Sequence, residues 1–215
     1  MATPREDELG YTGTATHQQT LVAASTSSIA DPGPLGLAAF AMTTMVLSVF
    51  NANLMKPASL ETIVLPLALF YGGLGQLLAG MWEFKKANTF GALAFTSYGA
   101  FWLAFWYLLT HVAATLPAAQ AHDAIGLFLL GWTIFTAYMT IGAVKVNGAV
   151  LVVFVLLTLT FLFLCIGNWG SHTGMVHVGG WLGLVTAAAA WYASLAGVAN
   201  ATWGKVVFPV YPASK

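Results

Sequence analysis

Charged residues are scarce in this chain of 215 residues: only 7% are Asp, Glu, Lys or Arg, whereas 59% are hydrophobic. Soluble domains carry about 25% charged residues, so the composition excludes that class and indicates an integral membrane protein. The seven basic and seven acidic residues also cancel, which leaves no basic face to neutralise phosphates. We therefore expect no nucleic-acid partner.

Cysteine is nearly absent as well. Cys165 is the only one, so the chain has neither an internal disulfide nor a cysteine pair of the metal-binding kind. His172 and His177 are five residues apart, a spacing that does not share a helical face, and no carboxylate accompanies them. We expect no metal site, no cofactor and no enzyme activity, since no nucleophile and base converge in the sequence.

We expect no secretory signal in the N-terminal region. Arg5 is followed by three acidic residues and a Thr/Ser/Gln-rich stretch, whereas a signal needs a basic start and then an apolar run. We predict that residues 1–30 form a disordered polar tail, that residues 31–205 form a transmembrane domain, and that residues 206–215 form a short C-terminal tail.

Six long apolar stretches dominate the rest of the chain. Crossing the bilayer takes about 20 mostly apolar residues, and the short connections leave almost nothing for an extramembrane domain. We predict an all-α integral membrane fold in which six transmembrane helices per protomer form a bundle with a central pathway. The predicted spans are residues 35–54, 63–82, 91–110, 124–144, 149–166 and 178–198.

The positions of the cations predict the orientation, because cytoplasmic loops retain Lys and Arg. With the N-terminus inside, only Lys56 falls on the opposite side. The six cytoplasmic cations are Arg5, Lys85, Lys86, Lys145, Lys205 and Lys215. We therefore predict a multi-pass protein of the plasma or inner membrane with both termini in the cytoplasm.

Two spans begin with typical capping residues. Asp31 can accept backbone N–H bonds before the first span, with Pro32 at the first helical position, and Asn88 and Thr89 do the same before the third. These residues are either ordinary caps, or they mark helix ends whose N–H groups face an anion. In the second case the carboxylate of Asp31 would compete with that anion.

The second span carries two polar side chains on one face. Gln76 and Glu83 are seven residues apart, and a carboxylate at the centre of a bilayer costs about 2.5 to 3.5 kcal/mol on insertion scales. Both are therefore expected to face a protein or water-filled interior. Since Glu83 lies beside Lys85 and Lys86, it either lines a pore or snorkels to the interface in a partial ion pair.

Hydroxyl and amide side chains recur at helical spacing in two other spans. Each Thr or Ser can bond to the preceding turn, but the faces together would line a path for a small solute. A short carboxylic acid has a pKa of about 4, so it is an anion at pH 7 and needs donors in place of water. The two sets are Phe40, Thr44, Ser48 and Asn51 in the first span, and Thr133, Thr136 and Thr140 in the fourth.

Several longer motifs follow one another in a characteristic order. Asp31-Pro-Gly-Pro-Leu-Gly-Leu37 resembles an Asn-Pro-Ala-Pro-Leu-Gly-Leu signature, and the similarity runs to about residue 205. The other matching segments are Phe70-Tyr-Gly-Gly73, Gln76, Ala79-Gly80, Glu83, Asn88-Thr-Phe-Gly91, Phe95-Thr-Ser-Tyr-Gly99 and Ile166-Gly-Asn168. The chain thereby resembles the acetate uptake transporter family, which includes bacterial succinate-acetate permeases and yeast acetate and ammonia transport proteins.

The resemblance implies a homo-hexamer in which each protomer has its own pathway. It also implies passage of acetate and related short carboxylates, described for the family both as proton-coupled symport and as channel-like permeation. The family's hydrophobic constriction falls on Phe40, Tyr98 and Leu157, and its entrance motif falls on Asp31, Pro32, Gly33, Pro34, Leu35 and Gly36. Asp31 and Gly33 depart from the signature, so an uncharged cap has become an anion.

These observations together predict which residues meet the solute. Besides the constriction, the residues expected along the pathway or at a substrate site are Thr44, Ser48, Asn51, Gln76, Glu83, Thr96, Ser97, Thr133, Thr136 and Asn168. We expect a transporter or channel for acetate and related short carboxylates, with succinate as a candidate substrate and with protons moving alongside. A channel for a neutral solute such as ammonia is the alternative. A membrane-embedded enzyme would need a catalytic set, and a scaffold would not need polar stripes.

Overall fold

The computed structural model describes residues 29–212. Within that range, six helical runs are long and apolar enough to cross a membrane, in agreement with the predicted all-α fold. The predicted tail of residues 1–30 falls almost wholly outside the described residues, and so does the end of the predicted tail of residues 206–215. The six runs are Gly33–Asn51, Ser59–Lys85, Thr89–Val112, Ala118–Ala143, Gly148–Trp169 and Thr173–Trp203.

Each predicted span corresponds to one run of helix. The first is α2 (Gly33–Asn51), and the last three are α6 (Ala118–Ala143), α7 (Gly148–Trp169) and α8 (Thr173–Trp203). The second run, Ser59–Lys85, contains η2 (Ala58–Ile63) from its second residue onward, α3 (Val64–Pro66), η3 (Leu67–Gly75) and α4 (Gln76–Lys85). The third consists of α5 (Thr89–Tyr107) and η4 (Leu108–Val112), followed by the short turn η5 (Ala113–Thr115).

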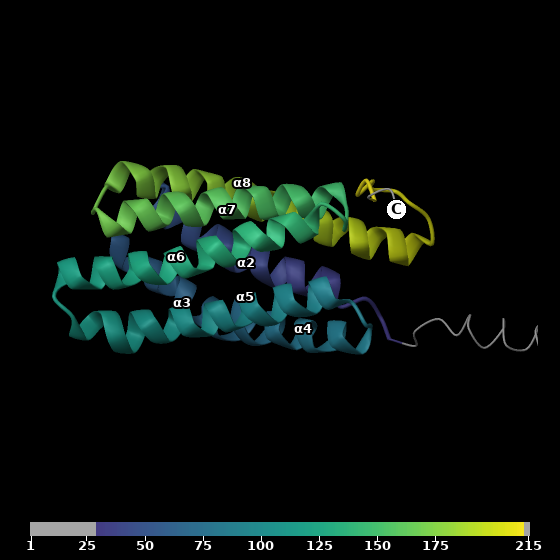
Figure 1. Ribbon diagram of the computed structural model, residues 1–215, viewed down its shortest axis with the longest axis horizontal. Helices are drawn as coiled ribbons and strands as arrows, with labels where there is room; N and C mark the ends of the chain where they lie inside the picture. The colour runs from purple at the N-terminus through teal and green to yellow at the C-terminus, as the bar shows by residue number, and fades with distance from the viewer. Residues whose placement is uncertain (1–28, 213–215) are drawn as a thin grey trace, which may run out of the picture. The chain divides into compact units, whose positions relative to one another are not determined.

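The helices lie side by side (Figure 1). The most extensive packing joins α2 to α8, α7 to α8, α6 to α7, and α4 to α5. We call the end of the bundle where α2 begins and α8 ends the termini end, and the opposite end, where α2 ends and α8 begins, the distal end.

The second run approaches its neighbours closely through small residues. A Cβ atom on Gly72 would lie 2.6 Å from Thr43 Oγ1 of α2 and 2.9 Å from Trp102 Cδ1 of α5. Because close van der Waals contact drives helix association in lipid, this glycine holds three helices together. In η3 the backbone forms the wider turn of a π-helix, which is frequent at functional sites.

The start of α2 differs by one residue from the prediction. Asp31 Oδ1 does accept a backbone hydrogen bond, from Gly33 N at 3.1 Å, but the helix begins at Gly33 and Pro32 is its N-cap. The prediction that Pro32 is the first helical residue was therefore wrong. The cap of α5 agrees with the prediction, because Asn88 Oδ1 accepts from Gly91 N at 3.2 Å.

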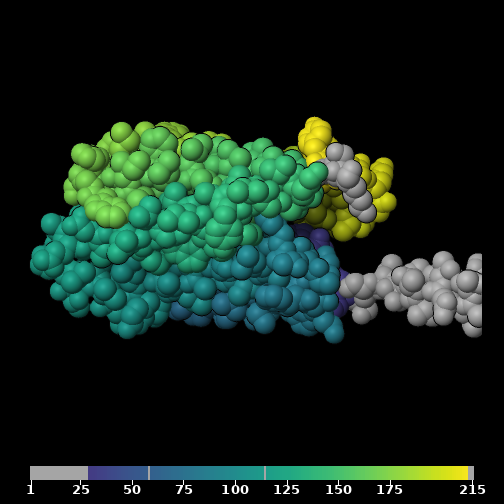
Figure 2. Space-filling model, in the orientation of Figure 1, coloured from purple at the N-terminus to yellow at the C-terminus, as the bar shows by residue number. Residues whose placement is uncertain are grey.

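The chain after α8 turns back onto the bundle. In this C-terminal segment (residues 205–212), the amides of Val207 and Phe208 donate to Asn200 Oδ1 at 2.7 and 3.0 Å. Further along, the carbonyls of Val210 and Tyr211 accept from the first amides of α7, at 3.2 and 2.8 Å. The segment lies at the termini end (yellow in Figure 2).

Candidate functional site

Three cavities follow one another through the bundle. The distal cavity measures about 110 Å³, the central cavity about 20 Å³, and the termini-end cavity about 250 Å³. The distal and central cavities share Phe40 and Leu157. The central and termini-end cavities share four residues, Leu37, Ala94, Phe95 and Phe154. The three cavities therefore form a line with its narrowest part in the centre.

The predicted constriction residues meet at that narrow part. Phe40 of α2, Tyr98 of α5 and Leu157 of α7 all line the central cavity. Each is at most 4% exposed, and the rings of Phe40 and Tyr98 have centroids 6.0 Å apart. A cavity of about 20 Å³ has room for roughly one water molecule, so these side chains nearly close the line.

A hydrogen bond fixes the ring of Tyr98. Its hydroxyl lies 2.8 Å from Thr136 Oγ1, and Thr136 Oγ1 donates to the carbonyl of Trp132 at 2.7 Å. A hydroxyl has one proton to donate, so Tyr98 must be the donor to Thr136. Thr136, predicted as a pathway residue, thus holds the constriction from α6.

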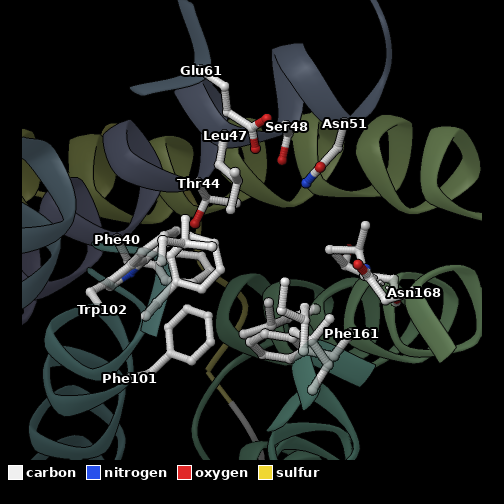
Figure 3. Close-up of a pocket in the computed structure, with 17 residues that line it drawn as sticks. Phe40, Thr44, Leu47, Ser48, Asn51, Glu61, Phe101, Trp102, Phe161 and Asn168 are labelled. Carbon is white, nitrogen blue, oxygen red and sulfur yellow. Dashed lines mark hydrogen bonds between the residues drawn. The ribbon is translucent and has the colours of Figure 1, made fainter. Parts of the chain in front are cut away.

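The polar face predicted for the first span lines the distal cavity. Thr44, Ser48 and Asn51 all line it, and their side chains lie along one side of the cavity (Figure 3). Asn168 contributes from α7, with its Nδ2 donating to the carbonyl of Leu164 at 2.9 Å. Four predicted pathway residues are therefore brought together here.

Two further residues of the distal cavity escaped the sequence analysis. Trp102 lines it, and its buried Nε1 has no hydrogen-bond partner among the described residues, as is also true of Thr44 Oγ1. Glu61 of η2 lines the same cavity. A buried polar group without a partner is costly. A carboxylate in the cavity could accept hydrogen bonds from the unpaired indole N–H and hydroxyl and would remove that cost.

Gln76 lies at the centre of the line. It is 1% exposed, it lines the central cavity, and its Oε1 has no hydrogen-bond partner among the described residues. The prediction that Gln76 faces a protein interior is consistent with this burial. The amide is the one polar side chain of the central cavity besides the tethered hydroxyl of Tyr98.

The termini-end cavity contains part of the predicted entrance motif. Asp31, Gly33 and Pro34 line it together with Glu83. Gly36 lies deeper, where an added Cβ would come within 2.6 Å of the ring of Phe95. The remaining two residues lie elsewhere: Pro32 is the N-cap of α2, and Leu35 is 46% exposed.

Glu83 faces the interior and does not snorkel. It is 1% exposed, and its Oε2 accepts a hydrogen bond from Asn88 Nδ2 at 2.9 Å. Lys86 instead pairs with Asp31, with Nζ 2.8 Å from Oδ1. The sequence left two possibilities open for Glu83, and the geometry selects the buried one.

The other predicted pathway residues lie in helix contacts. Thr133 Oγ1 donates to the carbonyl of Leu129 at 2.8 Å. Thr140 of the same face bonds Thr158 across α6 and α7 at 3.0 Å. Thr96 packs against Gly80, and Ser97 is half-buried in α5. The residues that line the three cavities do not include these four.

The charges along the line are acidic. The described residues that line the three cavities include Asp31, Glu61 and Glu83, and none of them is a lysine, arginine or histidine. Between residues 29 and 212, no group of three His, Cys, Asp or Glu side chains is placed to hold a metal ion. The arrangement offers neutral donors and aromatic walls to a small solute.

Known proteins are similar to this chain in sequence. The Escherichia coli "Succinate-acetate/proton symporter SatP" is 39% identical over 184 residues, which cover 86% of this chain and 96% of the relative. The Saccharomyces cerevisiae "Ammonia transport outward protein 2" is 40% identical over 185 residues, or 84% of this chain. The chain spans 65% of the length of that yeast relative.

A solved structure and a family model extend the comparison. The solved structure of the bacterial acetate channel SatP matches with a TM-score of 0.78 and 39% identity, covering 85% of this chain and 99% of that one. Residues 12–215 match the model described as the GPR1/FUN34/yaaH family. With nearly its whole length matched and the fold shared, the chain belongs to the GPR1/FUN34/yaaH family.

Proposed function

We propose that the protein carries acetate and related short carboxylates, including succinate, across the membrane along the line of three cavities. The observation that carries this proposal is the meeting of Phe40, Tyr98 and Leu157, from three separate helices, between two larger cavities. The names of the bacterial relative and of the solved structure support the same solute.

The chemistry of the cavities suits a weakly held anion. Thr44 Oγ1 and Trp102 Nε1 are unpaired donors in the distal cavity, and they can replace part of the water that an acetate ion loses. Because the lining includes no fixed cation, binding stays weak, and a permeating species must also leave. Phe40 and Leu157 then separate the two cavities by an apolar step.

Protons are proposed to move with the carboxylate. A neutral acid crosses an apolar step at far lower cost than its anion, and the narrow section between the cavities is walled mainly by apolar side chains. The name of the bacterial relative, a succinate-acetate/proton symporter, supports the proposal of proton coupling.

The same proposal includes the setting of the protein. We place it in the plasma or inner membrane with both termini cytoplasmic, because cytoplasmic loops retain Lys and Arg. Four lysines lie at the helix ends of the termini end, and Lys56 lies between α2 and η2 at the other end. The four are Lys85, Lys86, Lys145 and Lys205. A homo-hexamer with one pathway in each protomer is proposed from the family resemblance. A role as transporter and not as enzyme accords with the transport functions named for both relatives.

Uptake into vesicles tests the function. Purified protein in liposomes should take up labelled acetate faster than protein-free liposomes, and an inward proton gradient should accelerate the difference. Because acetic acid also crosses lipid unaided, protein-free vesicles at the same two pH values give the background to subtract. Equal uptake with and without protein would contradict the proposal.

Ammonia is the second candidate solute. It is favoured by the similarity to the yeast protein named for ammonia transport. Competition separates the two candidates, because unlabelled acetate should slow labelled acetate uptake while ammonium at the same concentration and pH should not. Inhibition by ammonium together with protein-dependent ammonium flux would favour the second candidate.

A further inference from the structure

Glu61 places a carboxylate in the distal cavity. It belongs to η2, at the distal end of the bundle, and it is half-buried. Figure 3 shows its carboxylate on the same side of the cavity as the side chains of Ser48 and Asn51. No hydrogen bond or ion pair joins this side chain to another described residue, so its oxygens remain available to a solute.

The surroundings of Glu61 leave that charge uncompensated. The elements that pack on η2 are α2 and α3, and neither contains a charged residue. Glu61 is also the only charged side chain among the 17 residues that line the distal cavity. A carboxylate solute that enters this cavity therefore meets a like charge with no cation to offset it.

Other titratable groups at the distal end lie outside the cavity lining. His122 of α6 reaches Asn168 Oδ1 at 3.4 Å, and it is exposed, as are its neighbour Asp123 and Lys56 in the loop before η2. None of these three side chains is part of the cavity lining. These three side chains are exposed at the surface, whereas Glu61 lines the cavity.

We propose that Glu61 is the residue at which a proton joins the carboxylate substrate, an inference that rests on the proposed function. Two carboxylates in one site cannot both remain charged at low cost, and they share a proton instead. A proton from water on the distal side first binds the Glu61 carboxylate. The new O–H group then donates a hydrogen bond to the entering anion, and the proton passes to the substrate, which restores the Glu61 carboxylate and yields a neutral acid.

The next step along the line fits a neutral acid. A short carboxylic acid and a glutamic acid have similar ordinary acidities, so the transfer between them is nearly balanced. Beyond the distal cavity stand Phe40 and Leu157, whose apolar side chains favour a neutral over a charged species. One proton accompanies each monocarboxylate, and the overall movement carries no net charge.

Electrical coupling tests the proposal. Liposomes with wild-type protein should show acetate uptake that does not respond to a potassium diffusion potential set with valinomycin, and an internal pH dye should report one proton per acetate. Glu61→Gln should admit the bare anion, because the amide bears no charge. Its acetate distribution should then respond to the potential, by up to about tenfold per 59 mV.

Controls separate this effect from a structural one. Asp123→Asn removes an exposed carboxylate at the same end of the bundle and should leave uptake electroneutral, and Glu61→Asp should keep the coupling. Potential-dependent uptake by the wild type, a wild-type ratio of protons to acetate far from one, or electroneutral uptake by Glu61→Gln would each overturn the proposal. If Glu61→Gln does not fold, Glu61→Ala is the second variant, and electroneutral uptake by that variant would overturn the proposal equally. Absence of any protein-dependent acetate movement would instead overturn the proposed function.

Discussion

The hydroxyl of Tyr98 donates to Thr136 Oγ1 over 2.8 Å, and this bond ties a ring of the constriction on α5 to the backbone of α6. The tie is indirect, since the Thr136 hydroxyl donates its own hydrogen bond to the carbonyl of Trp132. The position of the ring is thus set from a neighbouring helix.

Removing this tie should loosen the constriction. Tyr98→Phe keeps the ring and loses one buried hydrogen bond, which contributes about 1 kcal/mol. If the bond restrains the ring during passage, acetate flux should rise about fivefold, the rate equivalent of that free energy. Tyr138→Phe is the matched control, because Tyr138 is 49% exposed on α6. Unchanged initial rates of labelled acetate uptake in Tyr98→Phe would show that the bond does not limit passage.

Shortening the apolar side chains should relax size selection. Phe40→Ala and Leu157→Ala widen the narrowest part of the line, and one methylene group in a tight apolar site is worth about tenfold or more in discrimination. We therefore expect the preference for acetate over propionate and butyrate to fall by about tenfold in an uptake series. Leu159→Ala, two residues along α7 and 37% exposed, should keep the wild-type preference. A preference that survives in both constriction variants would remove these residues from the gate.

Neutralising Asp31 should strengthen the attraction of anions to the termini-end cavity. Asp31→Asn keeps an acceptor for Gly33 N but frees Lys86 from its ion pair. Such a partly exposed pair contributes about 0.2 to 1 kcal/mol, so the protein should stay folded. The apparent KM for acetate presented from the termini side should fall at low ionic strength and return toward wild type in salt, because exposed charges are screened.

The readout for Asp31 is uptake in vesicles whose outward-facing side has been determined by protease protection. Asp123→Asn, at the other end of the bundle, should leave the KM on this side unchanged. A KM for Asp31→Asn equal to that of wild type at low salt would show that this charge has no influence on substrate at that mouth.

The bond between Asn88 and Glu83 should contribute to stability beyond its capping role. Asn88 caps α5 and also donates to Glu83 Oε2, whereas Asn147 caps α7 through Val150 N at 2.8 Å. Loss of a cap costs about 1 kcal/mol, and a hydrogen bond to a charged group contributes about 1.5 to 3 kcal/mol. Asn88→Ala should therefore destabilise the protein more than Asn147→Ala.

Unfolding in detergent gives the free energies for this comparison. A double-mutant cycle tests whether the extra loss of unfolding free energy in Asn88→Ala arises from the charge of Glu83. If it does, that extra loss should disappear when Asn88→Ala is made in a Glu83→Gln background. Equal losses for the two alanine variants in the wild-type background would assign Asn88 to capping alone.

The number and placement of the spans could be predicted from apolar length, because lipid imposes that length on every crossing helix. The first-span face was also predictable, since Phe40, Thr44 and Ser48 repeat at four-residue spacing and all three line one cavity. The meeting of Phe40 with Tyr98 and Leu157 was not predictable from spacing, which says nothing of how separate helices pack. It came from the family resemblance.

Glu61 was missed because the predicted second span begins at residue 63, whereas the helical run begins at Ser59. The charge of Glu61 lowers the mean hydropathy of the first turn of this span, so a search for apolar stretches places the start of the span after it. Thr133 was placed on the pathway for the opposite reason: its hydroxyl satisfies itself on the carbonyl of Leu129, and periodicity does not distinguish such a residue from one that faces a cavity.

The C-terminal segment (residues 205–212) folds back onto the bundle, and no hydrophobic periodicity in the sequence predicts this. The segment nevertheless affects the termini-end cavity, because Val210 helps to line it. The first amides of a helix carry partial positive charge and lack partners within it. At α7, the carbonyls of Val210 and Tyr211 cover two of them, on Ala149 and Gly148. Proteolytic trimming ahead of Val207 would uncover these amides beside the cavity and turn the start of α7 into an anion-attracting surface.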